Sequence, residues 1–145
     1  MNGYFDIALN LASERFSGER DKVIADALTR NVNFFNIVCS SLNELDFVKD
    51  LNDRYRQNSC FTLGVHPHNA NELNGDTLES LKDSIKIHQP SAVGETGLDF
   101  FRNLSSYENQ IDAFEQQIII SIENNLPLFL HQREAHDDFI KVIDK

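Results

Sequence analysis

The chain has 145 residues, enough for one ordinary domain with a sizeable core, and its 41% hydrophobic and 25% charged residues exclude a disordered or low-complexity chain. A formal net charge of −10 without a long Lys/Arg cluster excludes a general nucleic-acid-binding module, because such modules contact phosphates through clustered cations. No apolar run approaches the roughly 20 residues of a membrane span, so we expect no membrane segment, and the first residues lack the pattern of a secretory signal.

The first part of the chain alternates segments typical of strands and of amphipathic helices. Residues 4–9 predict a strand, and residues ~18–30 predict a helix because their apolar side chains recur at helical spacing. Residues 34–39 are rich in strand-forming side chains and predict a second strand. Ser41 and Glu44 form an S-x-x-E capping box, which predicts the start of a second helix.

The middle of the chain continues this alternation. Residues 60–65 predict a third strand, and Asp76 is the expected N-cap of a helix that ends before a proline. Residues 91–95 predict a short fourth strand, and Ser105 and Glu108 form a second capping box. The helix after this box should bury one apolar face, made of Ile111, Phe114, Ile118 and Ile122.

The last predicted elements are a strand over residues 126–131 and a helix over residues ~134–144. Strands that alternate with helices predict an α/β fold with a parallel sheet of about five βα units. Two architectures fit: an open doubly wound sheet, which length alone favours, and a (β/α)₈ barrel, which typically needs about 250 residues. No linker or composition shift divides the chain, so we expect residues 1–145 to form one domain or a piece of one.

Polar residues suited to chemistry collect where the predicted strands end, and parallel α/β folds place their active sites at that edge. In chain order these residues are Asp6, Asn10, His66, His68, Glu95, Asp99, His131, Arg133 and His136. Imidazole and carboxylate groups together suit zinc, manganese or magnesium. Taken singly, each has a more ordinary explanation, such as a turn residue for Asp99 or a surface cation for Arg133. The convergence of several strands on one edge is what predicts a metal site.

Glu95 is the strongest candidate in this set. Its carboxylate could bridge two cations about 3.5–4 Å apart, a recurring device in phosphodiester cleavage. Gly94 and Gly97 would let the backbone come close to such a site. We expect the fourth and fifth predicted strands to lie side by side and to aim Glu95 and His131 into one pocket.

Four segments resemble, in order and spacing, the motifs of the TatD family of metal-dependent deoxyribonucleases. They are residues 5–11, 64–68, 94–100 and 130–136. The elements G-V-H-P-H, G-E-x-G-L-D and H-x-R-x-A-H are highly specific in combination, although each alone is weak. The likeness runs through essentially the whole chain.

The resemblance implies an amidohydrolase-like TIM barrel that hydrolyses DNA phosphodiesters, typically 3′→5′ on single strands, with a divalent cation (Mg, Mn or Zn). Glu95 and His131 match the family's metal ligands. His66 matches a histidine suggested to contact the substrate phosphate or assist the reaction, so Glu95 and His66 are the candidate catalytic residues. The phosphate-binding set would be His66, His68, Arg133 and His136, and the other pocket residues would be Asp6, Asn10 and Asp99.

The chain departs from the family pattern in two places. Many members carry D-x-H-x-H on the first strand, where this chain has Ala8 and Asn10. A subgroup that includes the name-giving members also lacks this histidine pair, so the number of metals stays open. The family barrel continues for about another three βα units, with a further metal-binding histidine and an aspartate assigned as general base. We therefore expect a domain truncated before its last strands, weak metal binding, and little catalysis from these residues alone.

Several alternatives remain. A metal-dependent lactonase or deaminase could use the same fold, because one barrel hosts many reactions. The chain could also be an inactive remnant, or a binding partner that completes itself against another chain. An open-sheet nucleotide-binding protein is disfavoured, because the first strand-to-helix connection has a single Gly18 and no G-x-G-x-x-G pattern. The two cysteines are too few for a disulfide framework, so we expect a cytoplasmic protein, or a nuclear one in a eukaryote.

Overall fold

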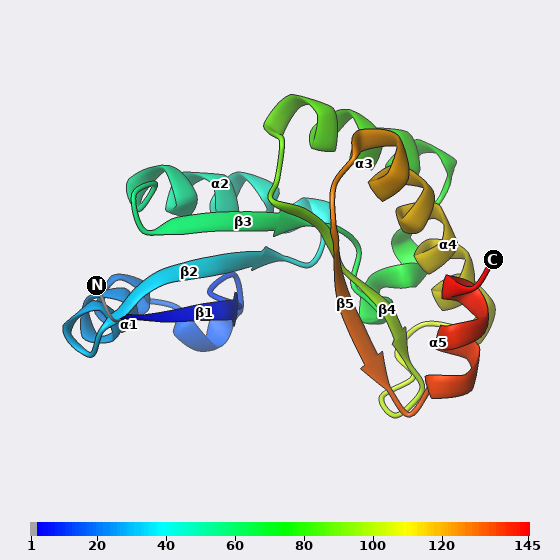
Figure 1. The fold of residues 1–145 in the computed structure, drawn as a ribbon, viewed down its shortest axis with the longest axis horizontal. Coiled ribbons are helices and arrows are strands. Elements are labelled where there is room, and N and C mark those ends of the chain that lie inside the picture. The colour runs from blue at the N-terminus through cyan, green and yellow to red at the C-terminus, as the bar shows by residue number, and fades with distance from the viewer. Residues whose placement is uncertain (1–2) are drawn as a thin grey trace.

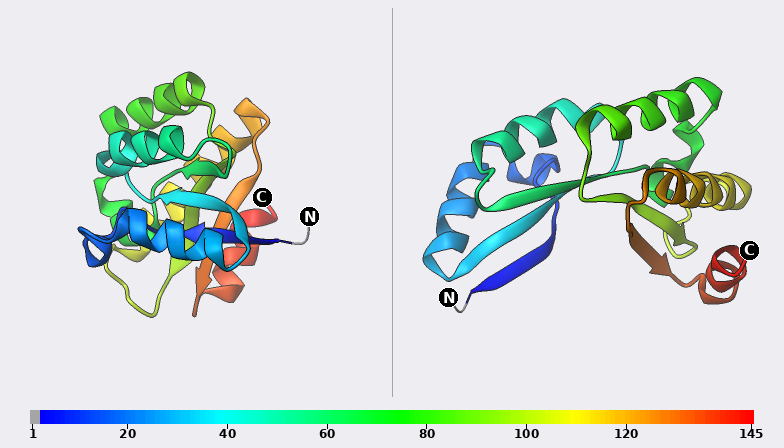
Figure 2. Two further views of the ribbon diagram at one scale, coloured as in Figure 1. Left: turned by 90° about the vertical axis from the view of Figure 1, so that its left-hand side faces the viewer. Right: turned by 45° about the horizontal axis from the view of Figure 1, so that its top comes forward.

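A computed structural model describes residues 3–145 and contains a five-stranded sheet with helices packed along its outside (Figure 1). The strand order is β1-β2-β3-β4-β5, and neighbouring strands are parallel throughout. A doubly wound sheet would instead reverse its order at a switch point, so the open-sheet alternative is wrong. The sheet curls as it passes from β3 to β5, which Figure 2 shows from two further sides. The fold is an incomplete (β/α) barrel, as the family resemblance implied.

The elements follow the predicted order, with shifted ends. The strands are β1 (Tyr4–Leu9), β2 (Val32–Cys39), β3 (Ser59–Leu63), β4 (Ala92–Asp99) and β5 (Leu128–Arg133). The α-helices are α1 (Arg20–Thr29), α2 (Leu45–Arg54), α3 (Gly75–His88), α4 (Tyr107–Asn124) and α5 (His136–Ile143). Short 3₁₀ helices are η1 (Glu14–Phe16), η2 (Leu42–Glu44) and η3 (Pro67–Glu72).

The largest shift concerns β4, which was predicted to end at Glu95 and continues to Asp99. Pairing with β5 extends it, because the register runs on to Asp99 opposite Arg133, with an irregularity at Glu95. Gly97 makes this pairing possible: its φ is +140°, and a Cβ there would collide with the carbonyl oxygen of His131. Glu95 and His131 therefore lie inside their strands, and the strand ends are Asp99 and Arg133.

Both predicted capping boxes are wrong by about one residue. At the start of η2, the Glu44 carboxylate accepts a hydrogen bond from the Ser40 backbone N–H (2.8 Å) in place of the Ser41 N–H. Residues 42–44 close as a 3₁₀ turn, so α2 begins only at Leu45. At α4 the N-cap is Ser106, whose hydroxyl accepts the Asn109 N–H (3.2 Å).

Ser105 is buried and has a different role from the predicted cap. Its hydroxyl donates to the His68 carbonyl oxygen (2.9 Å) and accepts the Asn71 N–H (3.1 Å). These two bonds tie the start of α4 to η3, the short helix that follows β3. Ser105 therefore helps to place His68.

The N-cap of α3 is Asn74 rather than Asp76, and this difference can be measured. The Asn74 amide oxygen accepts the N–H groups of Asp76 (3.1 Å) and Thr77 (3.2 Å), while the Thr77 hydroxyl accepts the Asn74 N–H (2.7 Å). Asn74→Ala should lower the free energy of unfolding by about 1 kcal/mol in urea denaturation. Asp76→Ala keeps this cap and should cost less, about 0.3–0.5 kcal/mol from the lost charge at the first turn. An equal or larger loss for Asp76→Ala would contradict the assignment.

The core has two parts. The larger packs α1, α2, α3 and part of α4 against β1–β4, around buried residues such as Phe35, Leu51 and Leu81. The smaller joins the far end of β4 to α4 and α5, and in it the rings of Phe114 and Phe139 stack at 5.0 Å.

The predicted apolar face of α4 is only partly right. Phe114 is fully buried, but Ile122 is 74% exposed. Gln110 and Gln117 lie in the buried face, with 1% and 0% exposure, because their amides hydrogen bond to backbone groups of the sheet and its loops. Because the prediction used only apolar residues, it placed the buried face of α4 at a slightly wrong angle around the helix axis.

Two expectations from the composition concern the cysteines and membrane-spanning segments, and residues 3–145 bear on both. Within this range both cysteines are free thiols, with Cys39 buried and Cys60 partly buried. None of the described helices is long and apolar enough to cross a membrane.

Candidate metal centre

A polar hollow of about 350 Å³ opens at the carboxyl ends of the strands. Its lining comes from the segments after β1, β2 and β3 and from β4 itself: Asn10, Ser13, Ser40, Glu44, His66, His68, Asn69 and Glu95. The hollow therefore lies where parallel α/β folds place their chemistry.

Three ligand-type atoms from three segments meet at this edge. His131 Nδ1, on β5, lies 3.1 Å from Glu95 Oε1, on β4. His66 Nε2, from the segment after β3, lies 3.3 Å from His131 Nδ1 and 3.9 Å from Glu95 Oε1. The prediction that β4 and β5 lie side by side and bring Glu95 and His131 together is confirmed, and of this pair Glu95 lines the hollow while His131 contacts Glu95 beside it.

The spacing of these atoms fits a single cation. Ligands about 2.0–2.1 Å from a tetrahedral metal stand roughly 3.3 Å from one another. The 3.1 Å separation of Glu95 Oε1 and His131 Nδ1 is close to that value, and His66 Nε2 lies 3.3 and 3.9 Å from His131 Nδ1 and Glu95 Oε1. Carboxylate and imidazole are also a donor set that suits Mg, Mn or Zn to different degrees. A divalent cation could therefore be held here, with Glu95 and His131 as its closest pair of ligands.

The hydrogen bonds of His66 give it a different role from His131. The backbone N–H of His68 donates to His66 Nδ1 (3.1 Å), so Nδ1 must be unprotonated. In a neutral ring the proton is then on Nε2, the nitrogen that faces the cluster. Burial lowers the pKa of His66 to about 4, which keeps the ring neutral. His66 therefore offers an N–H donor to the hollow, whereas a metal ligand needs a lone pair there.

Glu95 is ionised in this setting. Its burial opposes ionisation, but the hydrogen bond with His131 and the nearby rings of His66, His131 and His68 together lower the pKa of Glu95 below its usual value. The same hydrogen bond to Glu95, and a further one to Asp99, raise the pKa of His131. The cluster therefore holds a carboxylate that is charged and exposed to the hollow, as a cation ligand must be.

Asp99 is a second carboxylate in the cluster, and sequence reasoning underrated it. Its side chain is 1% exposed, and Oδ2 lies 2.7 Å from His68 Nε2 and 3.2 Å from His131 Nε2. Burial opposes its ionisation, but the Arg102 backbone N–H and the two imidazoles hold the pKa of Asp99 at about 2. Asp99 lies four residues after Glu95 in the segment G-E-x-G-L-D. If the length of β4 could be predicted, this spacing would place both carboxylates in the same strand.

Two further predicted pocket residues, Asp6 and Asn10, belong to β1 and to the segment that follows it. Asn10 lines the same hollow as His66 and Glu95, and its side chain accepts the Ser13 N–H (3.3 Å). Asp6 is exposed on β1, where it accepts the Ala8 N–H (3.1 Å). Their pocket roles stay predictions.

Arg133 and His136 lie beyond the cluster on the C-terminal side. Arg133 is exposed at the end of β5, with its guanidinium carbon 3.8 Å from the ring centre of Phe101. His136 is exposed as the first residue of α5. Among residues 3–145 neither forms a hydrogen bond or an ion pair with the cluster, so their phosphate-binding roles also stay predictions.

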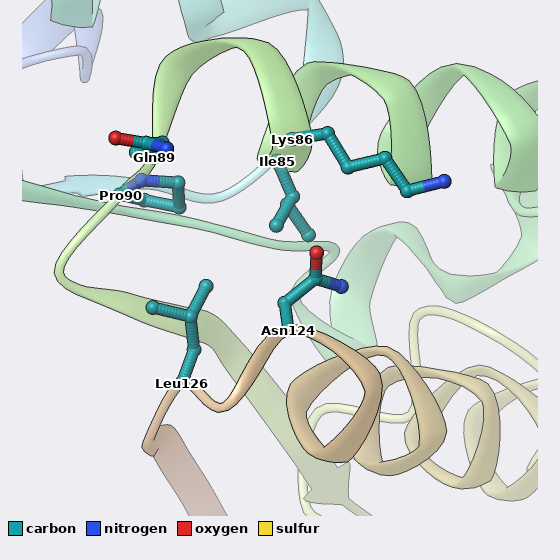
Figure 3. Close-up of a pocket in the computed structure, with 6 residues that line it drawn as sticks. All are labelled: Ile85, Lys86, Gln89, Pro90, Asn124 and Leu126. Carbon is teal, nitrogen blue, oxygen red and sulfur yellow. The ribbon is translucent and has the colours of Figure 1, made fainter.

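A larger hollow, of about 420 Å³, lies elsewhere (Figure 3). Figure 3 shows Ile85, near the end of α3, pointing toward Asn124 at the end of α4 and Leu126 just after it, and Lys86 and Gln89 lie beside Ile85. Pro90 and Leu126 lie two residues before the first residues of β4 and β5, so this hollow lies at the amino ends of the strands. That face of a barrel contributes to stability rather than catalysis.

Comparison with known proteins gives one consistent family. The model of the TatD-related DNase family matches residues 5–145. The protein named 3′-5′ ssDNA/RNA exonuclease TatD from Erwinia tasmaniensis is 41% identical over 141 residues, covering 96% of this chain and 54% of that protein. Proteins of the same name from Pantoea ananatis and Escherichia coli K12 are each 38% identical, covering 97% of this chain and 54% of theirs. The chain thus spans about half the length of the curated relatives it matches.

Solved structures give the same fold. A TatD homologue from Escherichia coli K12 superposes with a TM-score of 0.88 at 24% identity, covering 97% of this chain and 55% of that one. A TatD-family hydrolase from Entamoeba histolytica gives a TM-score of 0.89 at 24% identity, covering 99% and 54%. With the family match over nearly its whole length, the chain belongs to the TatD-related DNase family.

Proposed function

We propose that this chain is the metal-binding part of a hydrolase that cleaves phosphodiester bonds of single-stranded DNA, or RNA, from the 3′ end. The observation that carries this proposal is the meeting of Glu95 in β4, His131 in β5 and His66 after β3, beside the hollow at this edge of the sheet. The relatives' name, 3′-5′ ssDNA/RNA exonuclease TatD, supports the substrate and the direction. A cytoplasmic location and Mg, Mn or Zn as the cation belong to the same proposal.

The side chains of the cluster would have different roles in binding the cation and the phosphate. Glu95 Oε1 and His131 Nδ1 would hold the cation. When bound, a divalent cation supplies Lewis-acid polarisation of a phosphoryl oxygen and activates water. His66 would donate its Nε2–H to a phosphate oxygen, because its Nδ1 already accepts the His68 N–H. His68, Arg133 and His136 would add positive or donor groups around the phosphate.

The net charge of −10 makes this local arrangement necessary. An acidic chain gains little from general electrostatic attraction to a polyanion. A bound cation and a few aligned N–H donors can still hold one phosphate at the strand ends. Substrate binding should therefore depend strongly on the cation.

The test is a degradation assay with single-stranded oligonucleotides labelled at the 5′ end, with Mg²⁺, Mn²⁺ or EDTA. The chain is assayed alone and, where its reading frame continues past Lys145, as the full product. Stepwise shortening from the 3′ end with Mg²⁺ or Mn²⁺, and its loss in EDTA, would support the proposal. Turnover of a lactone or of an amino-purine by the full product, with oligonucleotides left intact, would support the hydrolase alternatives. The absence of all these activities in the full product would favour the inactive remnant.

A further inference from the structure

We propose that Asp99 is a positioning residue of the metal centre: it fixes the tautomer and ring orientation of His131, so that Nδ1 presents a lone pair toward Glu95. The inference deepens the proposed function, because it rests on the same cation site. It assigns Asp99 a defined task that acts through His131 rather than through contact with the substrate.

The two ring nitrogens of His131 face two different carboxylates. Nδ1 lies 3.1 Å from Glu95 Oε1, and Nε2 lies 3.2 Å from Asp99 Oδ2. A neutral imidazole carries one proton, and each ionised carboxylate can only accept it. If the proton is on Nδ1, it bonds to Glu95 and blocks the cation; if it is on Nε2, it bonds to Asp99 and leaves a lone pair on Nδ1. The two carboxylates therefore favour opposite tautomers of His131. Asp99 favours the tautomer that can bind a cation through Nδ1.

His66 supplies an independent argument for the same tautomer. Its Nδ1 accepts the backbone N–H of His68 (3.1 Å), which puts the ring proton on Nε2. His66 Nε2 lies 3.3 Å from His131 Nδ1, and in the metal-free chain its N–H can donate there only if Nδ1 holds a lone pair. The donors then run in one direction, from the backbone of His68 through His66 and His131 to Asp99.

Asp99 is itself held firmly enough to direct a neighbouring ring. Its other oxygen, Oδ1, accepts the Arg102 N–H (2.8 Å), and its own N–H donates to the Gln110 amide oxygen (2.8 Å). Oδ2 also lies 2.7 Å from His68 Nε2, so the rings of His68 and His131 both face this one oxygen. A buried carboxylate with all these partners cannot turn away from His131 without losing several hydrogen bonds. Carboxylates that orient a metal-bound histidine in this way typically change metal affinity when removed.

Asp99→Asn separates this role from a structural one, because it keeps the size of the side chain. If the amide oxygen keeps the Arg102 N–H, the NH₂ group takes the place of Oδ2 and faces His131 Nε2 as a donor. Nε2 must then accept, which moves the ring proton to Nδ1 and toward Glu95. If the new amide rotated by 180°, its NH₂ group would face the Arg102 N–H, and two donors would oppose each other. This rotation would therefore lose the hydrogen bond from Arg102.

The experiment reads the tautomer directly in the metal-free chain. Histidine rings labelled with ¹⁵N are recorded by long-range ¹⁵N–¹H NMR near pH 8.5, with a His131→Gln spectrum to assign the signals. We expect an Nε2–H ring for His131 in the wild type and an increased Nδ1–H population in Asp99→Asn and Asp99→Ala. Mn²⁺ affinity, measured by calorimetry, should fall about 10–100-fold in both variants. Circular dichroism checks that each variant is folded, and Asp83→Asn on the exposed face of α3 is the matched control.

Each outcome decides between the two proposals. Folded Asp99 variants that keep the wild-type tautomer, or keep Mn²⁺ affinity within about twofold, would overturn the positioning role and leave the metal centre intact. A wild-type chain with the expected tautomer that binds no Mn²⁺ would overturn the proposed metal site, while the effect of Asp99 on the ring would still stand.

Discussion

Replacing Glu95 by glutamine should remove most of the chain's affinity for divalent cations and any cation-dependent nuclease activity. Glutamine keeps the volume of the side chain but lacks the negative charge, and its amide offers a weaker ligand to a hard cation. Glu95 faces the hollow 3.1 Å from His131 Nδ1, so its loss leaves a single imidazole at the proposed site. We expect Mn²⁺ affinity to fall more than about 100-fold, beyond the range for residues that only orient a ligand. Calorimetry with Mn²⁺ and the oligonucleotide assay measure the two effects.

The matched control is Glu108→Gln, which makes the same change of charge at an exposed residue in the first turn of α4. It should leave Mn²⁺ affinity and activity close to wild type. Equal losses in the two variants would mean that net charge, rather than ligation, governs binding. Full Mn²⁺ affinity in Glu95→Gln would remove Glu95 from the site.

The order of strands and helices could be predicted because it depends on local signals. Apolar spacing and strand-forming residues are read within windows of about ten residues, and they located every strand and α-helix of residues 3–145. The meeting of Glu95 and His131 could be predicted as well, because consecutive βα units place successive strand ends at one edge. That step needed only the chain order, not the length of any strand.

The details that depend on pairing between distant segments could not be predicted. β4 continues to Asp99 because β5 pairs with it, and no residue near Asp99 signals that partner. The choice between an open sheet and a barrel depends on how consecutive strands neighbour one another, which periodicity does not contain. The caps moved from Asp76 to Asn74 and from Ser105 to Ser106 because neighbouring polar residues compete for one turn.

The buried amides of α4 were missed for a related reason. A glutamine in a helix is normally read as exposed, since most glutamines are. Gln110 and Gln117 are buried because each satisfies backbone groups that sheet pairing leaves free. These backbone groups lack a partner only because of how β3, β4 and the loops after them are arranged. Such residues are identified from hydrogen bonds rather than from composition.

Gln117→Leu should cause the largest loss of stability among the substitutions considered. The Gln117 amide oxygen accepts the Val65 N–H (2.8 Å), and its NH₂ group donates to the Val65 carbonyl (3.0 Å) and the Thr96 hydroxyl (2.8 Å). Leucine fills similar space but leaves the buried N–H and C=O of Val65 without these partners. Each such group costs about 1–3 kcal/mol, so we expect the free energy of unfolding to fall by about 3 kcal/mol in urea denaturation.

This substitution should also weaken cation binding, although Gln117 touches no proposed ligand. β3 pairs with β4 at Thr62 and Leu63, and beyond this point Gln117 joins the two strands through its side chain. Val65 directly precedes His66, and Thr96 directly follows Glu95, so the amide sets the spacing of both site residues. Gly64 leaves room for it, because a Cβ at that position would lie 2.7 Å from the Gln117 amide oxygen.

Gln116→Leu is the natural control, because it makes the same substitution one residue earlier, at a partly exposed position of α4. Its effect on stability should stay within about 0.5 kcal/mol, as for most surface changes. If Gln117→Leu matched it in both stability and Mn²⁺ affinity, backbone contacts alone would hold His66 opposite Glu95. If Gln117→Leu lost stability but kept full Mn²⁺ affinity, the amide would support the fold without setting the geometry of the site. The expected joint loss would instead show that one helix side chain ties the packing of α4 to the spacing of the cluster.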